Sequence, residues 1–174
     1  RAESTGCEIA FYGGSITELP ELSDEIVRCI RNGRVEDRAS NALYEIRRQT
    51  ESKGEQIKIK LNAILQKNKA WFSDNFVSVR GSHFTLPVKR EHKNNVPGSV
   101  IELSNTGSTC FIEPTAVSKL NQELAVLTVE EDGEIRKILY TLTALIHDDL
   151  PVIRRNIEAI ETLDFLFAKA KLSL

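Results

Sequence analysis

The side chains best suited to chemistry in this chain are cations gathered in one short stretch, residues 79–93. They surround a Gly81-Ser82 turn and a predicted strand that contains Leu86-Pro87. The six of them are Arg80, His83, Lys89, Arg90, His92 and Lys93. Cations placed in this way can contact the phosphates of a nucleic-acid backbone without reading its bases. The same pattern also fits solvated charge on edge strands, where lysine guards against aggregation.

Other reactive side chains do not assemble a reaction centre by their spacing. His83, His92 and Cys110 have the chemistry of zinc ligands, but gaps of nine and eighteen residues fit no compact ligand pattern and no fourth ligand is evident. The turn at residues 106–109 is rich in hydroxyls, yet it lacks the glycine-rich phosphate-binding pattern and predicts a hairpin turn. We therefore expect no catalytic residue, metal site or cofactor-binding residue in this segment.

Two long helices must hold this basic stretch in place. Ser40 is a candidate N-cap. A seven-residue repeat from Leu43 to Ile64, which would form a seam along one side of a helix, predicts a helix from Ser40 to about Asn68. A stronger seven-residue pattern runs from Val117 towards residue 145 and predicts a partner helix that begins near 113–114. Pro151 should end or kink this partner before a helical pattern resumes.

Between the two helices the apolar period changes from helical to strand-like. The stretches 76–79, 84–88, 99–103 and 109–112 are short, rich in β-branched or aromatic residues, and separated by glycine-containing turns. A β unit inserted between two helices with complementary seams requires an antiparallel pair that carries the unit at its far end. The predicted fold class is therefore mainly α with a small β insertion: a helical core, a long antiparallel helix pair (the lever) and a small antiparallel β clamp at its tip.

The predicted domain boundaries follow this arrangement. Residues 1–39 with 147–174 form a partial helical core, 40–70 with 114–146 form the lever, and 71–113 form the clamp. Within the core, Gly13-Gly14 is expected to break any helix, and a helix that begins near Leu19-Pro20 is expected to stop at Asn32-Gly33 with a left-handed cap.

Composition narrows the class of protein. The 174 residues are 41% apolar and 28% charged, with a net charge of −2, which is typical of a folded, soluble protein. No apolar run approaches a membrane span and no secretory signal is visible, so we expect no membrane partner. Three cysteines without a Cys-x-x-Cys pair fit reduced thiols and a cytoplasmic location. The absence of methionine, even at position 1, suggests a segment excised from a longer chain.

Charge is distributed unevenly along the chain. Residues 47–96 contain eleven Lys or Arg and four Asp or Glu, a balance of +7. Residues 113–164 contain eleven acids and five bases. Opposite charge favours pairing of the two long helices, although exposed pairs contribute only a few tenths of a kcal/mol each, so the apolar seam must supply most of the stability.

Several motifs together carry a resemblance to a known family. In chain order they are Leu19–Leu22, Asp37–Ser40, Phe84–Lys89, Val96–Gly98, Ser104–Pro114, Leu120–Leu124 and Leu163–Ala170. They resemble the middle of the second bacterial MutS paralogue, from about residue 19 to the end of the chain. The chain departs from the family pattern at Gly81, Ser82 and His83, where an Asn-Gly pair and a basic residue usually stand. Gly81 can still supply the positive φ of the turn, while His83 makes the charge there depend on pH.

The resemblance implies the core helices, lever and clamp of a MutS-type ATPase that grips DNA or RNA without sequence specificity. ATP and Mg²⁺ are implied for an ATPase domain, and an endonuclease domain for the C-terminal part of the parent protein, and both are expected to lie outside this segment. The parent is implied to be a homodimer that suppresses homologous recombination or splits collided ribosomes, with branched or duplex DNA, ribosomal RNA or the ribosome as partner.

Two other functions remain open from the residues alone. The acidic balance of the whole chain favours a protein- or ribosome-facing coiled-coil interaction or dimerisation module without direct DNA contact. A purely mechanical role, in which the arm only positions the ATPase and the clamp contacts nothing, is the third. If the segment grips nucleic acid, we expect Arg80, Lys89, Arg90 and Lys93 to contact phosphates, and His83 and His92 to make secondary contacts.

Overall fold

The computed structural model describes residues 8–172, which divide into two compact units. Of the described residues, 8–39 and 136–172 belong to one unit, and 40–135 form the other. Residues 1–7 and 173–174, the ends of the predicted core, lie outside the described residues, and so does Cys7. The three-part division into core, lever and clamp stays a prediction, since the structure groups residues 40–135 together.

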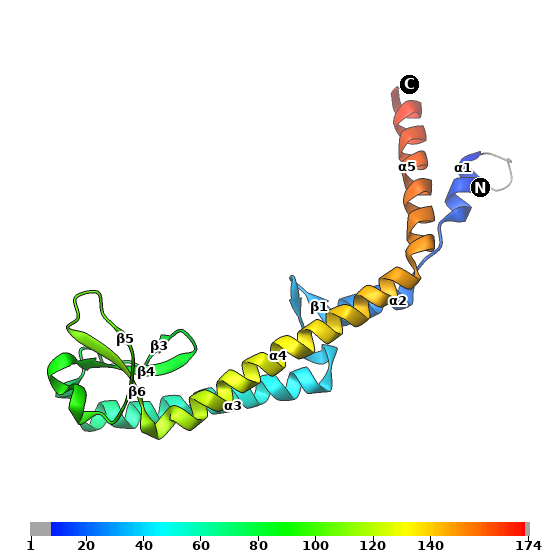
Figure 1. Cartoon of the computed structure of the whole chain (residues 1–174). Coiled ribbons are helices and arrows are strands. Elements are labelled where there is room, and N and C mark those ends of the chain that lie inside the picture. The colour runs from blue at the N-terminus through cyan, green and yellow to red at the C-terminus, as the bar shows by residue number, and fades with distance from the viewer. Residues whose placement is uncertain (1–7, 173–174) are drawn as a thin grey trace. The chain divides into compact units, whose positions relative to one another are not determined.

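The first unit is built from helices. It holds α1 (Glu8–Ser15), α2 (Pro20–Cys29), the 3₁₀ helix η2 (Asp37–Ala39), the last part of α4 (Thr115–Asp148) and α5 (Leu150–Leu172). Helix α1 lies against α5 (Figure 1). The Asn156 side chain bonds both backbone groups of Thr17, accepting from its N–H at 2.9 Å and donating to its carbonyl at 2.7 Å. This pair of bonds fixes the chain after α1 to α5.

Two sequence predictions in this unit are wrong. Gly13 and Gly14 do not break a helix, because both lie inside α1. Asn32-Gly33 is not a helix cap either, since α2 ends at Cys29 and a small hairpin follows, formed by β1 (Ile30–Arg31) and β2 (Arg34–Val35). Asn32 and Gly33 have φ angles of 51° and 73°. Positive φ at both central residues matches the twist of a two-residue hairpin turn, for which Asn-Gly is the preferred sequence.

The second unit begins with α3 (Asn41–Lys67), whose predicted cap is confirmed: Ser40 Oγ accepts a hydrogen bond from the Leu43 N–H at 3.0 Å. Helix α3 runs antiparallel to the first part of α4. Three contacts show this, in order along α3: Ser40 with Glu134 at 2.9 Å, Arg47 with Glu131 at 2.7 Å, and Lys53 with Glu123 at 2.5 Å. Lys53 lies on the side of α3 that faces α4, and its ammonium reaches Glu123 on that opposite helix.

A four-stranded antiparallel sheet lies at the end of this helix pair (Figure 1). Its strands are β3 (Ser78–Arg80), β4 (His83–Lys89), β5 (Gly98–Leu103) and β6 (Thr109–Pro114), in the spatial order β3-β4-β6-β5. Two 3₁₀ helices, η3 (Lys69–Trp71) and η4 (Arg90–Asn95), connect the pieces. The register pairs Leu86 with Ile112 and Val88 with Cys110.

One apolar core joins the sheet to the helices in the second unit. Leu86, Val88, Cys110 and Ile112 come from the sheet, and all four are almost completely buried. The helices contribute Ile57, Leu61, Leu65, Val117, Leu124 and Leu127 to the same cluster. The predicted seam therefore buries the inner face of the sheet as well as joining the two helices.

The predicted fold class is confirmed, since the described residues are mainly helical with small antiparallel sheets. Helix α4 ends at Asp148 and Pro151 lies in the first turn of α5, as the proline pattern predicted. Among the described residues, no helix has the length and apolarity needed to span a membrane.

Candidate nucleic-acid interface

The predicted cations lie at the two ends of β4. Arg80 and His83 flank the two-residue turn between β3 and β4, where Gly81 takes a φ of 59°. Lys89 and Arg90 lie where β4 passes into η4. Because a strand rises about 3.3 Å per residue, the two ends of this strand are about 20 Å apart. The six residues therefore form two groups and not one patch.

Arg80 is held against the outer face of the sheet. Its guanidinium lies 3.8 Å from the centroid of the Phe111 ring, a cation–π contact, and its Nε is 3.1 Å from Glu102 Oε2. Phe111 and Glu102 face each other in the β5–β6 register. The charge of Arg80 is thus largely matched by a carboxylate from the far strand of its own sheet.

His83 is also engaged within the sheet. Its Nδ1 lies 2.5 Å from Glu113 Oε2, and this carboxylate is buried, with 7% of the side chain exposed. Asn121 Nδ2 of α4 donates to the same oxygen at 2.9 Å. Burying a carboxylate is costly unless it is hydrogen-bonded, so His83 and Asn121 together satisfy Glu113.

The other end of β4 offers a more open group. Lys89 Nζ donates to the Ala70 carbonyl at 2.9 Å, and Arg90 Nη1 contacts the Gly107 carbonyl at 3.4 Å. The Arg90 N–H donates to the Ser108 carbonyl at 2.9 Å, which places η4 beside the β5–β6 turn. The result is a shallow hollow of about 560 Å³ lined by Lys89, Arg90, Glu91 and Ser108. We call it the basic hollow.

His92 and Lys93 follow within η4. His92 Nε2 is 3.5 Å from Glu91 Oε1, and its ring centroid is 6.4 Å from that of Trp71. Lys93 is exposed, and it forms no ion pair with another residue of the described chain. The structure thus brings Lys89 and Arg90 together, with Lys93 close in sequence, and holds Arg80 and His83 against two separate carboxylates, Glu102 and Glu113.

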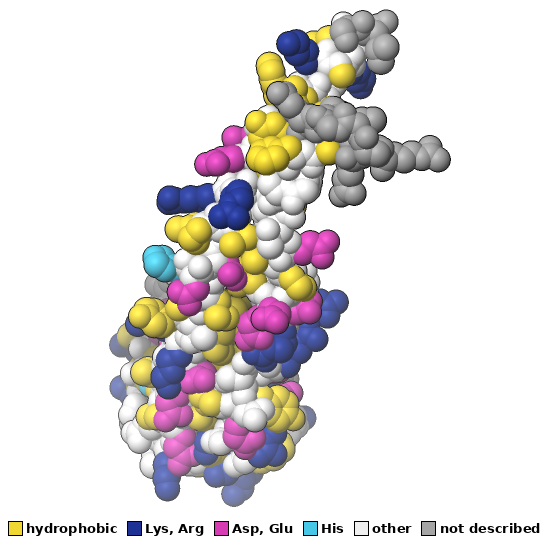
Figure 2. Space-filling view, turned by 90° about the vertical axis from the view of Figure 1, so that its right-hand side faces the viewer, with side chains coloured by type: hydrophobic (Ala, Val, Ile, Leu, Met, Phe, Trp, Pro, Cys, Tyr) yellow, Lys and Arg dark blue, Asp and Glu magenta, His cyan; other side chains and the backbone are white. Residues whose placement is uncertain are grey.

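The charge pattern of the second unit is mixed elsewhere. Two pairs between α3 and α4, Arg47 with Glu131 and Lys53 with Glu123, place cations beside acids. On the face of the molecule drawn in Figure 2, Lys and Arg side chains likewise stand close to Asp and Glu side chains. The cross-helix bond from Lys53 holds the pKa of Glu123 below its ordinary value, with burial opposing this in part. Within the described residues, no group of three or more His, Cys, Asp or Glu is arranged to hold a metal ion.

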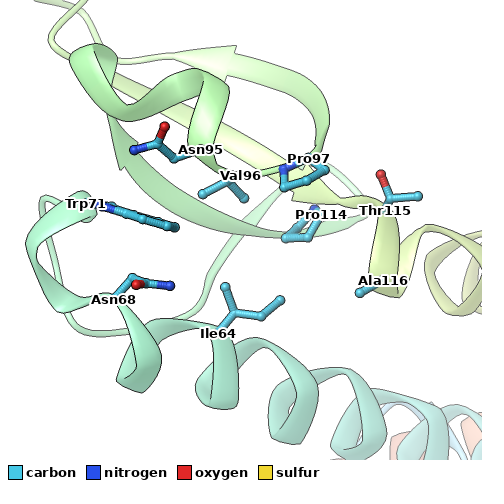
Figure 3. Close-up of a pocket in the computed structure, with 9 residues that line it drawn as sticks. All are labelled: Ile64, Asn68, Trp71, Asn95, Val96, Pro97, Pro114, Thr115 and Ala116. Atoms are coloured by element: carbon cyan, nitrogen blue, oxygen red, sulfur yellow. The ribbon is translucent and has the colours of Figure 1, made fainter.

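Sequence reasoning missed two features of this region. Ser108 joins the basic hollow although it was predicted only as a hairpin residue, and its hydroxyl-rich turn was the available signal. The second feature is a pocket of about 360 Å³ beside Trp71, between the end of α3 and the start of α4 (Figure 3). No sequence pattern indicated it, because its lining residues come from four separate segments.

Comparison with known proteins finds relatives named Endonuclease MutS2. The one from Clostridium perfringens is 44% identical over 137 residues, which is 79% of this chain and 17% of that protein. Those from Clostridium kluyveri and Clostridium botulinum are 41% and 39% identical over 157 residues, which is 90% of this chain and 20% of each protein. The chain thus spans a fifth or less of the length of these relatives. No family model matches the chain.

Proposed function

Because this chain belongs to the MutS2 proteins as a segment of that family, we propose that it grips nucleic acid without reading the base sequence. The relatives are named as endonucleases, which act on nucleic acid. The observation that carries the proposal is the basic hollow. Two adjacent cations, Lys89 and Arg90, line an open surface together with Ser108 and one acid, Glu91, and the two cations are suited to phosphate oxygens.

The roles of the six predicted residues differ in this proposal. Lys89, Arg90 and exposed Lys93 make the main phosphate contacts. Arg80 and His83 would first have to leave Glu102 and Glu113, so their contribution is smaller. His92, which lies in η4, makes a secondary contact to the same backbone. Contacts of this kind attract any backbone by charge and release counterions, so affinity should fall steeply with salt.

The wider function is proposed from the family. The whole protein would be a MutS-type ATPase with ATP and Mg²⁺ bound outside this segment, an endonuclease domain, and a homodimeric assembly in the cytoplasm. The antiparallel pair of α3 and α4 would transmit ATP-driven movement to the sheet. Suppression of recombination, through DNA, and splitting of collided ribosomes, through ribosomal RNA, are the two processes that such a grip would serve.

A protein- or ribosome-facing interface is the second candidate function. It is favoured by apolar side chains that α4 leaves exposed in the second unit, Val126 at 57% and Val129 at 72%. A contact of this kind would bury apolar surface, and its affinity would depend little on salt.

Charge reversal tests the proposal. The test variant carries both Lys89→Glu and Arg90→Glu. The control variant carries both Lys58→Glu and Lys60→Glu in α3, which changes the net charge by the same amount. Binding to duplex DNA, branched DNA and structured RNA is measured by fluorescence anisotropy at several salt concentrations. The first variant should bind at least about tenfold more weakly, and the slope of log affinity against log salt should shrink by about 0.9 per lost duplex phosphate contact.

The control variant should keep most of its affinity, because its lysines lie on α3 away from the hollow. Equal loss in both variants would mean that only net charge matters, and unchanged binding in the first would exclude the basic hollow as the interface. Salt-tolerant ribosome binding that is lost on Val126→Asp with Val129→Asp would favour the second function.

A further inference from the structure

The pocket beside Trp71 lies entirely within the second unit and is made by four segments. These are the end of α3, the helix η3, the connection from η4 to β5, and the junction of β6 with α4 (Figure 3). Its volume of about 360 Å³ is in the range of pockets that hold small molecules or single rings. It is built from the same segment that carries the basic hollow, since Arg90 and Asn95 are the two ends of η4.

The lining of this pocket is mostly apolar with a few polar groups. The apolar members are Ile64, Trp71, Val96, Pro97, Pro114 and Ala116. In Figure 3 the Trp71 ring projects into the pocket from one side and the two prolines face it from the other. Flat, rigid walls of this kind suit a planar ring, which can lie against an aromatic or proline surface at little conformational cost.

The polar members could recognise the edge of such a ring. They are Asn68, Asn95 and Thr115, which offer amide donors, amide acceptors and a hydroxyl. Within the described part of the chain, the side chains of Asn68 and Thr115 have no hydrogen-bond partner. Asn95 contacts only His92 in this way, at a long 3.4 Å. These groups are therefore available to a ligand.

Charge around the pocket selects the kind of ligand. Lys67 and Lys69 flank Asn68 and are exposed, and no acidic residue occurs between Glu55 and Asp74. The exposed Lys93 precedes Asn95 by two positions. Acids in the neighbouring segments are limited to Glu91 on η4 and the buried Glu113 before Pro114, so the three exposed lysines favour a ring carried on a polyanion over a neutral or basic peptide.

We infer that the pocket receives one unpaired nucleobase of a strand whose backbone lies on the basic hollow, an inference that rests on the proposed function. The base lies against Trp71, and the amides of Asn68 and Asn95 bind its edge. A six-residue 3₁₀ helix rises about 2 Å per residue, so η4 places the hollow and the pocket about 10 Å apart along its axis. One or two nucleotides span that distance. The segment would then favour bulged, branched or single-stranded sites over fully paired duplex.

The wild-type chain provides the first test. Three duplexes are compared: one fully paired, one with a single bulged nucleotide, and one with the same bulge lacking its base. The two bulged duplexes have the same phosphates, so any difference between them comes from the base. We expect the intact bulge to bind roughly 5- to 150-fold more tightly than the abasic one, the range that base stacking on an aromatic ring supplies.

Intrinsic fluorescence gives a second readout, because Trp71 is the only tryptophan of the chain. The intact bulge should change the tryptophan emission at saturation, and the abasic bulge should not. Equal affinity for both bulges with unchanged emission would overturn the base pocket. If that binding still fell steeply with salt, the proposed grip on the backbone would stand. No measurable binding to any duplex would overturn both.

Variants test whether the preference for the intact bulge arises in the pocket. Trp71→Ala should remove the preference for the intact bulge while leaving affinity for the paired duplex unchanged, and Trp71→Phe should retain most of it. Phe76→Ala is the control, because Phe76 is an aromatic with 60% exposure that does not line the pocket. Trp71 also packs against the core, so thermal unfolding accompanies each variant. If Trp71→Ala fails to fold, the comparison of the intact and abasic bulges with the wild-type chain still tests the base pocket.

Discussion

Asn121 on α4 makes both backbone hydrogen bonds of Phe84 on β4. Its Oδ1 accepts from the Phe84 N–H at 3.3 Å, and its Nδ2 donates to the Phe84 carbonyl at 3.3 Å. Strand β6 pairs with β4 only from Leu86 onward, so no strand satisfies Phe84 on that side. The side-chain amide takes the place of a strand backbone there, and it joins the helix pair to the sheet.

Asn121→Asp should destabilise the chain by about 2 to 4 kcal/mol. The change removes the donor to Phe84 and places a second carboxylate beside buried Glu113, which Asn121 contacts at 2.9 Å. The measurement is urea unfolding at neutral pH. Gln122→Glu is the matched control, because it converts an exposed amide to a carboxylate at the next position and should have little effect. Equal effects of the two substitutions would contradict this account.

Gly98→Ala should destabilise the sheet by about 1 to 3 kcal/mol. A methyl group at this position would lie 2.1 Å from the Glu113 carbonyl oxygen, which belongs to the backbone of β6 and cannot move aside. Gly54→Ala in α3 should instead stabilise by up to about 1 kcal/mol, since its methyl group meets open space and alanine favours the helix. Urea midpoints of both variants test the opposite signs, and a stable Gly98→Ala protein would contradict the close approach.

Leu61→Ala should cost about 2 to 5 kcal/mol, because Leu61 is fully buried where the helices meet the sheet. Ile59→Ala removes a side chain of equal size from the same helix, but Ile59 is 68% exposed, so the expected change is within about 0.5 kcal/mol. Comparable losses at both positions, measured by urea unfolding, would mean that the seam is not where the structure places it.

The ion pair between Lys53 and Glu123 should contribute stability only above acidic pH. The hydrogen bond from Lys53 lowers the pKa of Glu123 from its ordinary value of 4.5, an effect that burial partly offsets. Because the folded pKa is the lower one, the stabilisation is present above about 4.5 and is lost as pH falls through the folded pKa. Lys53→Met should therefore lower the melting temperature at pH 7 and change it much less at pH 3.

Lys58→Met serves as the comparison for that experiment. Lys58 pairs with Glu55 on the same helix, and both side chains are about half exposed, so this pair should matter less than the cross-helix one. A Lys53→Met deficit as large at pH 3 as at pH 7 would assign the effect to packing of the lysine stem and not to the ion pair.

Much of the fold could be predicted from the sequence because its signals are local. The Ser40 cap, the seam residues Leu43, Ile57 and Leu61, and the turn at Gly81 each depend on neighbours within a few positions, and the structure confirms them. Asn32-Gly33 misled the prediction because its preference for positive φ fits a helix cap and a hairpin turn equally. Only the pairing of Ile30 with Val35 distinguishes the two.

In the candidate site, too, local features could be predicted from the sequence and long-range contacts could not. The sequence by itself determined which side chains carry positive charge and that they flank one strand. Tertiary structure decided which of them remain available to a ligand, because Glu102 and Glu113 approach Arg80 and His83 from strands about twenty to thirty positions away. The Trp71 pocket is likewise a product of four segments brought together. The type of each side chain is given by the sequence at that position. Whether the side chain can bind a ligand depends on which distant residue the strand register places beside it.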